Sequence, residues 1–183
     1  MIFAGLKRKT LQYFFDKKRQ EKENHYRESG NTKNQEIKPH KITKIGVLLN
    51  DKIEGPSVVN NLVKVFGFDK KQITFLVHKP QLDVKKEANS EGMFGNADFG
   101  WYGSIKNPLV KDFVQSDFDL LINYSAKSNL YIDVLVLLSK ASFKVSHAGN
   151  KDDLYDLVVA TGLKDVSTLN EEAKKYLQIL KKI

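Results

Sequence analysis

The sequence of 183 residues contains no cysteine, no long apolar run and none of the usual nucleotide-binding motifs. Without cysteine the chain can form no disulfide, no thiolate metal site and no thiol nucleophile, which suits a reducing compartment. Its apolar runs fall short of the ~18 residues that a membrane span needs. No apolar stretch and cleavage site follow the early basic residues Lys7, Arg8 and Lys9, so we expect no secretory signal and a cytoplasmic location.

Phosphate-binding loops are missing where an α/β fold would place them. The first predicted strand is followed by N-D-K-I-E-G at residues 50–55 instead of G-x-G-x-x-G, and no G-x-x-x-x-G-K-[ST] occurs. The two carboxylates in this turn would repel a pyrophosphate. His25 and His40 have no ligand partners at metal spacing. We therefore expect no cofactor, neither a nucleotide nor a metal.

Positive charge is concentrated at one end of the chain. The formal net charge is +8. Residues 1–44 hold 12 basic and 5 acidic side chains, a net of +7, whereas residues 45–183 hold 18 and 17, a net of +1. This asymmetry predicts an anionic partner for the N-terminal end, either nucleic acid or an acidic membrane surface.

Residues 1–28 are expected to contain a basic helix over residues 2–28, and the polar residues 29–43 to form a linker. The apolar side chains of the helix are Phe3, Leu6, Leu11, Phe14 and Phe15. On a helical wheel they cover more than half of the circumference, and two lysines fall inside that arc. The helix therefore packs its apolar side on the rest of the chain or inserts it into an acidic membrane, and the mixed wheel counts against the membrane.

Residues 44–183 predict an α/β domain, with a small doubly wound and mostly parallel sheet of four to five strands, Rossmann-like or flavodoxin-like. Its predicted centre is the strand at residues 117–124, where Leu120, Leu121 and Ile122 follow one another without a polar break. The last helix is expected to begin with a capping box at residues 168–171. The expected core comprises Val47, Leu48, Phe75, Leu76, Leu120, Ile122, Leu135 and Val145.

Residues 79–103 show neither helical nor strand periodicity and carry the only tryptophan, Trp101. An irregular segment of this length is typical of a lid, a binding loop or a flexible excursion. Between contact with a ligand and packing as a satellite cluster on the domain, we favour packing for the aromatic residues of this segment. The tripeptide Asp98-Phe99-Gly100 matches a kinase metal-binding motif, but the other kinase motifs are absent, so we interpret the match as chance.

Polar side chains follow the expected carboxyl ends of the strands, where open parallel sheets collect ligands. The candidate ligand site comprises Asn50, Asp51, His78, Tyr124, Ser125 and His147, with Trp101 on the loop above them. Two imidazoles and a carboxylate on one rim could support acid–base chemistry. Because polar residues also end strands simply to be hydrated, a ligand-binding or enzymatic role is the minority hypothesis.

The favoured hypothesis is a non-enzymatic protein whose basic helix binds RNA in a ribonucleoprotein such as the ribosome, while the neutral domain contacts proteins. Cations interleaved with aromatic residues on a helix can bind backbone phosphates without reading bases. The candidate RNA-binding residues are Lys7, Arg8, Lys9, Lys17, Lys18 and Arg19. The plain alternative is a solvated charge run on a helix that only packs against its own domain.

Four stretches also carry a family resemblance: I-G-V-L-L-N at 45–50, D-F-G-W-Y-G-S-I-K-N at 98–107, F-D-L-L-I-N-Y at 118–124 and K-Y-L-Q-I-L-K-K-I at 175–183. With the basic leader, they resemble an uncharacterised family of Bacteroidota proteins along nearly the whole chain. This resemblance implies a Rossmann-like or flavodoxin-like domain. It implies no known activity and no catalytic residue.

Overall fold

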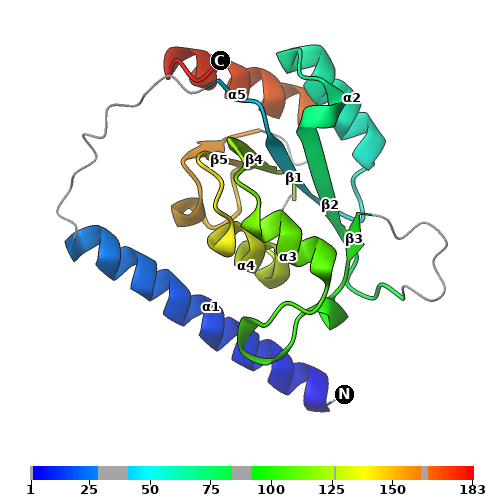
Figure 1. The fold of residues 1–183 in the computed structure, drawn as a ribbon, viewed down its shortest axis with the longest axis vertical. Coiled ribbons are helices and arrows are strands. Elements are labelled where there is room, and N and C mark those ends of the chain that lie inside the picture. Colours follow the sequence, from blue (N-terminus) through cyan, green and yellow to red (C-terminus); the bar gives the residue numbers. More distant parts are fainter. Residues whose placement is uncertain (1, 29–40, 84–91, 126, 162–164) are drawn as a thin grey trace.

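The computed structural model describes residues 2–28, 41–83, 92–125, 127–161 and 165–183, and it contains a six-stranded parallel sheet in the order β3-β2-β1-β4-β5-β6 (Figure 1). The strands are β1 (Ile45–Asn50), β2 (Ile73–His78), β3 (Met93–Phe94), β4 (Leu120–Asn123), β5 (Lys144–His147) and β6 (Leu157–Val159). The helices are α1 (Ile2–Glu28), α2 (Gly55–Phe66), α3 (Pro108–Gln115), α4 (Leu130–Leu138) and α5 (Val166–Ile179). The predicted class is confirmed, with six strands instead of four to five.

The strands follow the order of a Rossmann-type sheet. From β1 the chain first adds β2 and β3 on one side and then β4, β5 and β6 on the other side, so the switch point of the sheet lies between β1 and β4. Strand β3 lies inside the segment that we predicted to be irregular, so that prediction was wrong for residues 93–94. Two residues are too short for a periodic pattern, and β3 is held by its pairing with Val77 and His78. Residues 84–91 of the same segment lie outside the described residues.

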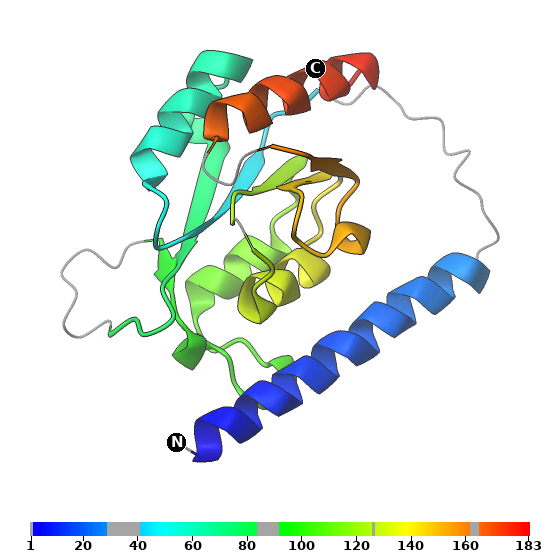
Figure 2. The same cartoon turned by 180° about the vertical axis from the view of Figure 1, so that it is seen from behind.

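Helices cover both faces of the sheet (Figure 2). On one face, α2 and α5 bury Val58, Leu62 and Leu177 against the sheet. On the other face, α3 and α4 bury Phe113 and Leu135. Strand β4 lies between β1 and β5, and all four of its residues are buried, which confirms it as the centre. A continuous apolar run is what a strand covered on both faces requires.

Seven of the eight predicted core residues are buried, and the exception is Phe75. This residue lies in β2 and is only partly buried, and its ring lies close to Gly92 and Gly55. The start of α5 also differs from the prediction. Its N-cap is Asp165, whose carboxylate accepts hydrogen bonds from the N–H and the hydroxyl of Thr168. The capping box at residues 168–171 was therefore wrong, because a stronger cap lies three residues earlier.

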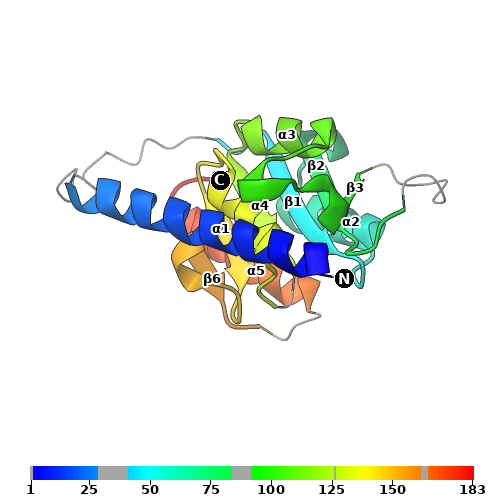
Figure 3. The same ribbon diagram turned by 90° about the horizontal axis from the view of Figure 1, so that it is seen from below.

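Helix α1 lies outside α4 and crosses it (Figure 3). Its range matches the predicted helix over residues 2–28. Leu11 and Phe15 are fully buried in the cluster that contains α3 and α4, and Phe14 is partly buried there. By contrast, Phe3 is 79% exposed and Leu6 is 49% exposed. The helix thus packs on the domain through the last three residues of its apolar set. Residues 29–40 of the predicted linker lie outside the described residues.

Candidate nucleic-acid interface

Polar contacts fix α1 on the domain at both ends of its buried apolar pair. The ammonium group of Lys7 donates to the Asn96 carbonyl at 3.2 Å, and burial together with the neighbouring Lys106 lowers the pKa of Lys7. Arg19 forms an ion pair with Asp153 at 2.5 Å between Nε and Oδ2. Lys22 donates to the Leu137 carbonyl at the end of α4. Lys7 and Arg19, which we predicted as RNA ligands, therefore also attach the helix to the domain.

The other four predicted RNA-binding residues remain in solvent. Arg8, Lys9 and Lys17 are exposed and form no ion pair within the described residues. Lys18 pairs with Glu21 at 2.7 Å on the surface of the helix. An exposed pair of this kind contributes about 0 to 1 kcal/mol, so Lys18 can exchange its partner for a phosphate at little cost. We call Arg8, Lys9, Lys17 and Lys18 the exposed cations of α1.

A short turn beside α1, η3 (Trp101–Gly103), holds two exposed aromatic side chains. Trp101 is 45% exposed and Tyr102 is 63% exposed. Gly103 packs against the ring of Phe14, so the turn touches the helix directly. The prediction placed Trp101 above the strand-end site, whereas the structure places it beside α1. Sequence reasoning could not find this contact, because it depends on how the helix docks.

A pocket of about 210 Å³ lies at the carboxyl end of β2, between the first turns of α1 and α4. It is lined by Arg8, His78, Pro80, Asn96, Ser128, Asn129, Leu130 and Tyr131. Among the described residues no carboxylate lines it, and one lining side chain is cationic. We call it the strand-end pocket. Of the predicted ligand-site residues, His78 is the one that the structure places in its wall.

His78 is held by two asparagines in this pocket. Its Nε2 lies 2.9 Å from Asn96 Oδ1, and its Nδ1 lies 3.3 Å from Asn129 Nδ2. These partners assign the proton to Nε2, which donates to Asn96, while Nδ1 accepts from Asn129. Its ring also stacks on Tyr131, with centroids 5.5 Å apart. Burial lowers the pKa of His78, so the imidazole is neutral at physiological pH and organises the amides around it.

The two histidines of the predicted site do not converge. His78 follows Leu76, which packs under α3 and α4, whereas His147 follows Val145, which packs under α2 and α5. Side chains two residues apart in a strand share a face, so the imidazoles point to opposite faces of the sheet. Joint acid–base action of His78 and His147 on one substrate is therefore contradicted.

The remaining predicted ligand residues are dispersed. His147 Nδ1 lies 2.9 Å from Thr161 Oγ1, and Tyr124 donates to Asn170 Oδ1 at 2.5 Å, inside the α2–α5 side. Burial raises the pKa of Tyr124, which keeps its phenol neutral. Ser125 is buried, while Asp51 is exposed at the end of β1. These contacts give Tyr124 and His147 structural roles in the fold.

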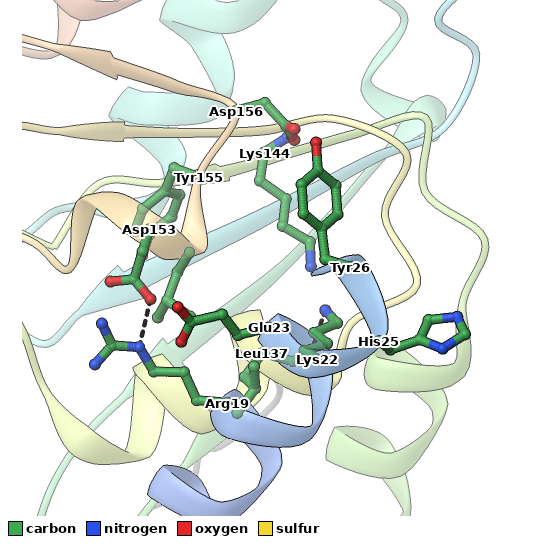
Figure 4. A pocket seen from close by; sticks show the side chains of 11 residues that line it. Arg19, Lys22, Glu23, His25, Tyr26, Leu137, Lys144, Asp153, Tyr155 and Asp156 are labelled. Atoms are coloured by element: carbon green, nitrogen blue, oxygen red, sulfur yellow. Dashed lines mark hydrogen bonds and ion pairs between the residues drawn. The ribbon is translucent and has the colours of Figure 1, made fainter. Parts of the chain in front are cut away.

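A second hollow, of about 570 Å³, lies between the C-terminal half of α1 and the ends of α4 and β5 (Figure 4). The Arg19–Asp153 pair lies at one side of it, and Lys144 extends into it from β5. Lys144 is buried and donates to the carbonyls of Val136 and Ser139 at 2.8 and 3.1 Å. Burial, and then the charge of Lys22, lower the pKa of Lys144 to about 8. Sequence reasoning missed Lys144, because a single lysine in a strand with polar neighbours gives no sign that its side chain is buried.

A parallel sheet in Rossmann order, combined with a basic helix packed on one side, defines the chain as a Rossmann-type α/β protein whose first strand is not followed by a G-x-G-x-x-G motif. The chain belongs to the family of unknown function DUF6913, whose family model matches residues 7–180. No protein of curated function and no solved structure matches it significantly. Among the described helices, none has the length and apolar character to cross a membrane. The described residues also contain no cluster of three or more His, Cys, Asp or Glu side chains suited to a metal ion.

Proposed function

We propose that the protein is a cytoplasmic, non-enzymatic RNA-binding protein that joins a ribonucleoprotein such as the ribosome. The observation that carries this proposal is the exposure of Arg8, Lys9, Lys17 and Lys18 along a helix that is itself fixed on the domain. Cations held on a docked helix meet phosphates without the entropic cost of ordering a free arm. Phosphate contacts position a protein on RNA and require no base readout.

The acidic membrane surface is less well supported as the anionic partner. That alternative needed the whole apolar set of the helix for insertion, yet Leu11 and Phe15 are buried in the domain. The exposed Phe3 and Leu6 alone bury little apolar area in a bilayer. The family resemblance implies a source among the Bacteroidota. Bacterial ribosomal RNA is therefore the natural probe for the proposal.

The test is the salt dependence of RNA binding by purified protein. Each phosphate contact contributes about 0.7 to 0.9 to the slope of log affinity against log salt. Replacing all four exposed cations by glutamine (R8Q/K9Q/K17Q/K18Q) should therefore flatten the slope by up to about 3. The matched control K64Q/K70Q/K71Q/K181Q removes four exposed cations around α2 and α5, far from α1. Equal slopes for the two variants would overturn the proposal.

The strand-end pocket supports a second candidate function, the binding of a small anion. Arg8 is a cationic side chain in the pocket wall with no carboxylate among the described lining residues, and the side-chain amides of Asn96 and Asn129 line the same wall. Isothermal titration with inorganic phosphate should give a signal that Asn129→Ala removes. Lys9→Gln serves as the control, because it removes a neighbouring charge outside the pocket. Absence of heat with the native protein would exclude this candidate.

A further inference from the structure

The turn that carries Trp101 and Tyr102 is a closed, backbone-bonded structure. The Gly100 N–H donates to the Ser104 carbonyl at 2.6 Å, and the Ser104 N–H donates to the Trp101 carbonyl at 3.2 Å. Phe99 and Ile105 form an antiparallel bridge below it, and Phe99 is fully buried. These contacts fix the backbone that carries the two aromatic side chains relative to the domain. We call Trp101 and Tyr102 the aromatic tip.

The same turn is clamped on α1. Gly103 has φ +76°, and a Cβ added there would lie 2.3 Å from the ring of Phe14. Only glycine satisfies both the left-handed backbone and this close approach. Phe14 is in turn part of the helix that carries the exposed cations. The turn η3, which carries the aromatic tip, therefore has a fixed position beside α1, and Figures 1 and 2 show the ribbon of this segment against the helix from opposite sides.

The backbone of Tyr102 is strained. Its φ is 53°, in the left-handed region that a bulky residue rarely occupies. Strain of this kind persists only where the surrounding structure imposes it, and it is concentrated at binding sites. Here it holds a tyrosine ring in water beside an exposed tryptophan, where neither ring completes a core. The fold gains little packing from Tyr102, which is 63% exposed, so the strain points to a role in recognition.

Lys106 follows the aromatic tip by four residues in the sequence. Lys7 and Lys106 lie close enough for each charge to act on the other, and Lys106 is exposed. The carboxylate of Asp98 acts on the charge of Lys7, and it already accepts a hydrogen bond from the Gly95 N–H at 2.8 Å. A protein partner would need acidic groups to match this surface as well as an apolar pocket for the rings. An unpaired nucleic acid supplies both phosphates and flat bases in every nucleotide.

We propose that the aromatic tip is a stacking platform for unpaired RNA bases, with neighbouring phosphates bound by exposed cations of α1. This inference rests on the proposed RNA-binding function and specifies its substrate as single-stranded RNA. Stacking on aromatic side chains is tolerant of sequence, because every base has a π-face. Little preference for base identity is therefore expected. A duplex of the same length has no free base faces and leaves the aromatic tip unoccupied.

Trp101 reports on its own occupancy, because the chain has no other tryptophan. Titration with an oligouridylate of about 12 nucleotides should quench its fluorescence, and a duplex of that length should not. Trp101→Ala and Tyr102→Gly should each weaken oligouridylate binding, measured by anisotropy of labelled RNA, by roughly 5-fold or more. Tyr176→Ala is the matched control, since it removes a 46% exposed tyrosine from α5. Circular dichroism of each variant checks that the fold is retained.

The outcomes separate this inference from the proposed function. Quenching by single strands alone, with weaker binding by both tip variants, supports the stacking platform. If oligouridylate binds with the expected salt slope but leaves Trp101 fluorescence and the affinities of the tip variants unchanged, the platform is refuted and phosphate binding by α1 stands. If the native protein binds neither oligouridylate nor duplex, the proposed function fails and the platform with it.

Discussion

The ammonium groups of Lys22 and Lys144 both donate to carbonyls at the end of α4, Lys22 to Leu137 and Lys144 to Val136 and Ser139. Lys22 comes from α1 and Lys144 from β5, so these two elements are both joined to the C-terminal end of α4. The two lysines supply the partners that the last carbonyls of a helix lack. Because they carry the same charge, each also makes protonation of the other less favourable.

Stability should therefore rise with pH in a window set by Lys144. Its pKa is about 8 in the folded chain against 10.5 in the unfolded one, so between these values the unfolded state binds more protons. A neutral amine keeps two N–H groups for its two carbonyls. From pH 8 to about 10.5, Lys144 should add up to ~3 kcal/mol to the free energy of unfolding. Below pH 8 this contribution is lost.

Urea unfolding of the native protein and of Lys144→Met across that range measures the effect, because other titrating groups are common to both proteins. The difference between their unfolding free energies should grow with pH in favour of the native protein. Parallel pH profiles would show that Lys144 keeps an ordinary pKa.

The docking of α1 predicts that alanine substitutions at buried and at exposed positions of this helix change the free energy of unfolding by very different amounts. Phe15→Ala removes a fully buried ring and should cost about 3 to 5 kcal/mol of unfolding free energy. Phe3→Ala removes a 79% exposed ring from the same helix and should change the free energy of unfolding by less than about 0.5 kcal/mol. Denaturant unfolding of both variants distinguishes a docked helix from a detached arm, for which the two values would be similar.

The centre of the sheet offers a second stability test. Leu121→Ala or Ile122→Ala should cost about 2 to 5 kcal/mol, because both side chains are fully buried in β4. Leu109→Ala, at a 41% exposed position on α3, is the control and should cost much less. A loss below about 0.5 kcal/mol for both β4 variants would contradict a central β4.

The sequence predicted the fold well where burial is uniform. Leu120, Leu121 and Ile122 indicated a central strand because a strand covered on both faces needs an unbroken apolar run. The sequence could not show that His78 and His147 face opposite sides, because this depends on which helices cover each face of the sheet. Strand β3 was missed because its two residues are defined by pairing with β2 and by no pattern of their own.

The candidate interface was predicted by its charge but not by its geometry. The excess of cations in residues 1–44 was visible from composition. Which of them would be used for attachment was not, because the roles of Lys7 and Arg19 depend on Asn96 and Asp153, far along the chain. The position of Trp101 beside α1 likewise depends on Gly103 fitting against Phe14.

Sedimentation of cell lysate on a sucrose gradient tests the central claim most directly. At low salt the native protein should migrate with ribonucleoprotein particles, and at high salt or after ribonuclease treatment it should return to the top of the gradient. The variant R8Q/K9Q/K17Q/K18Q should stay at the top at all salt concentrations, while K64Q/K70Q/K71Q/K181Q should migrate as the native protein does. Native protein that remains at the top at low salt, and that shifts no purified RNA, would contradict RNA binding by α1.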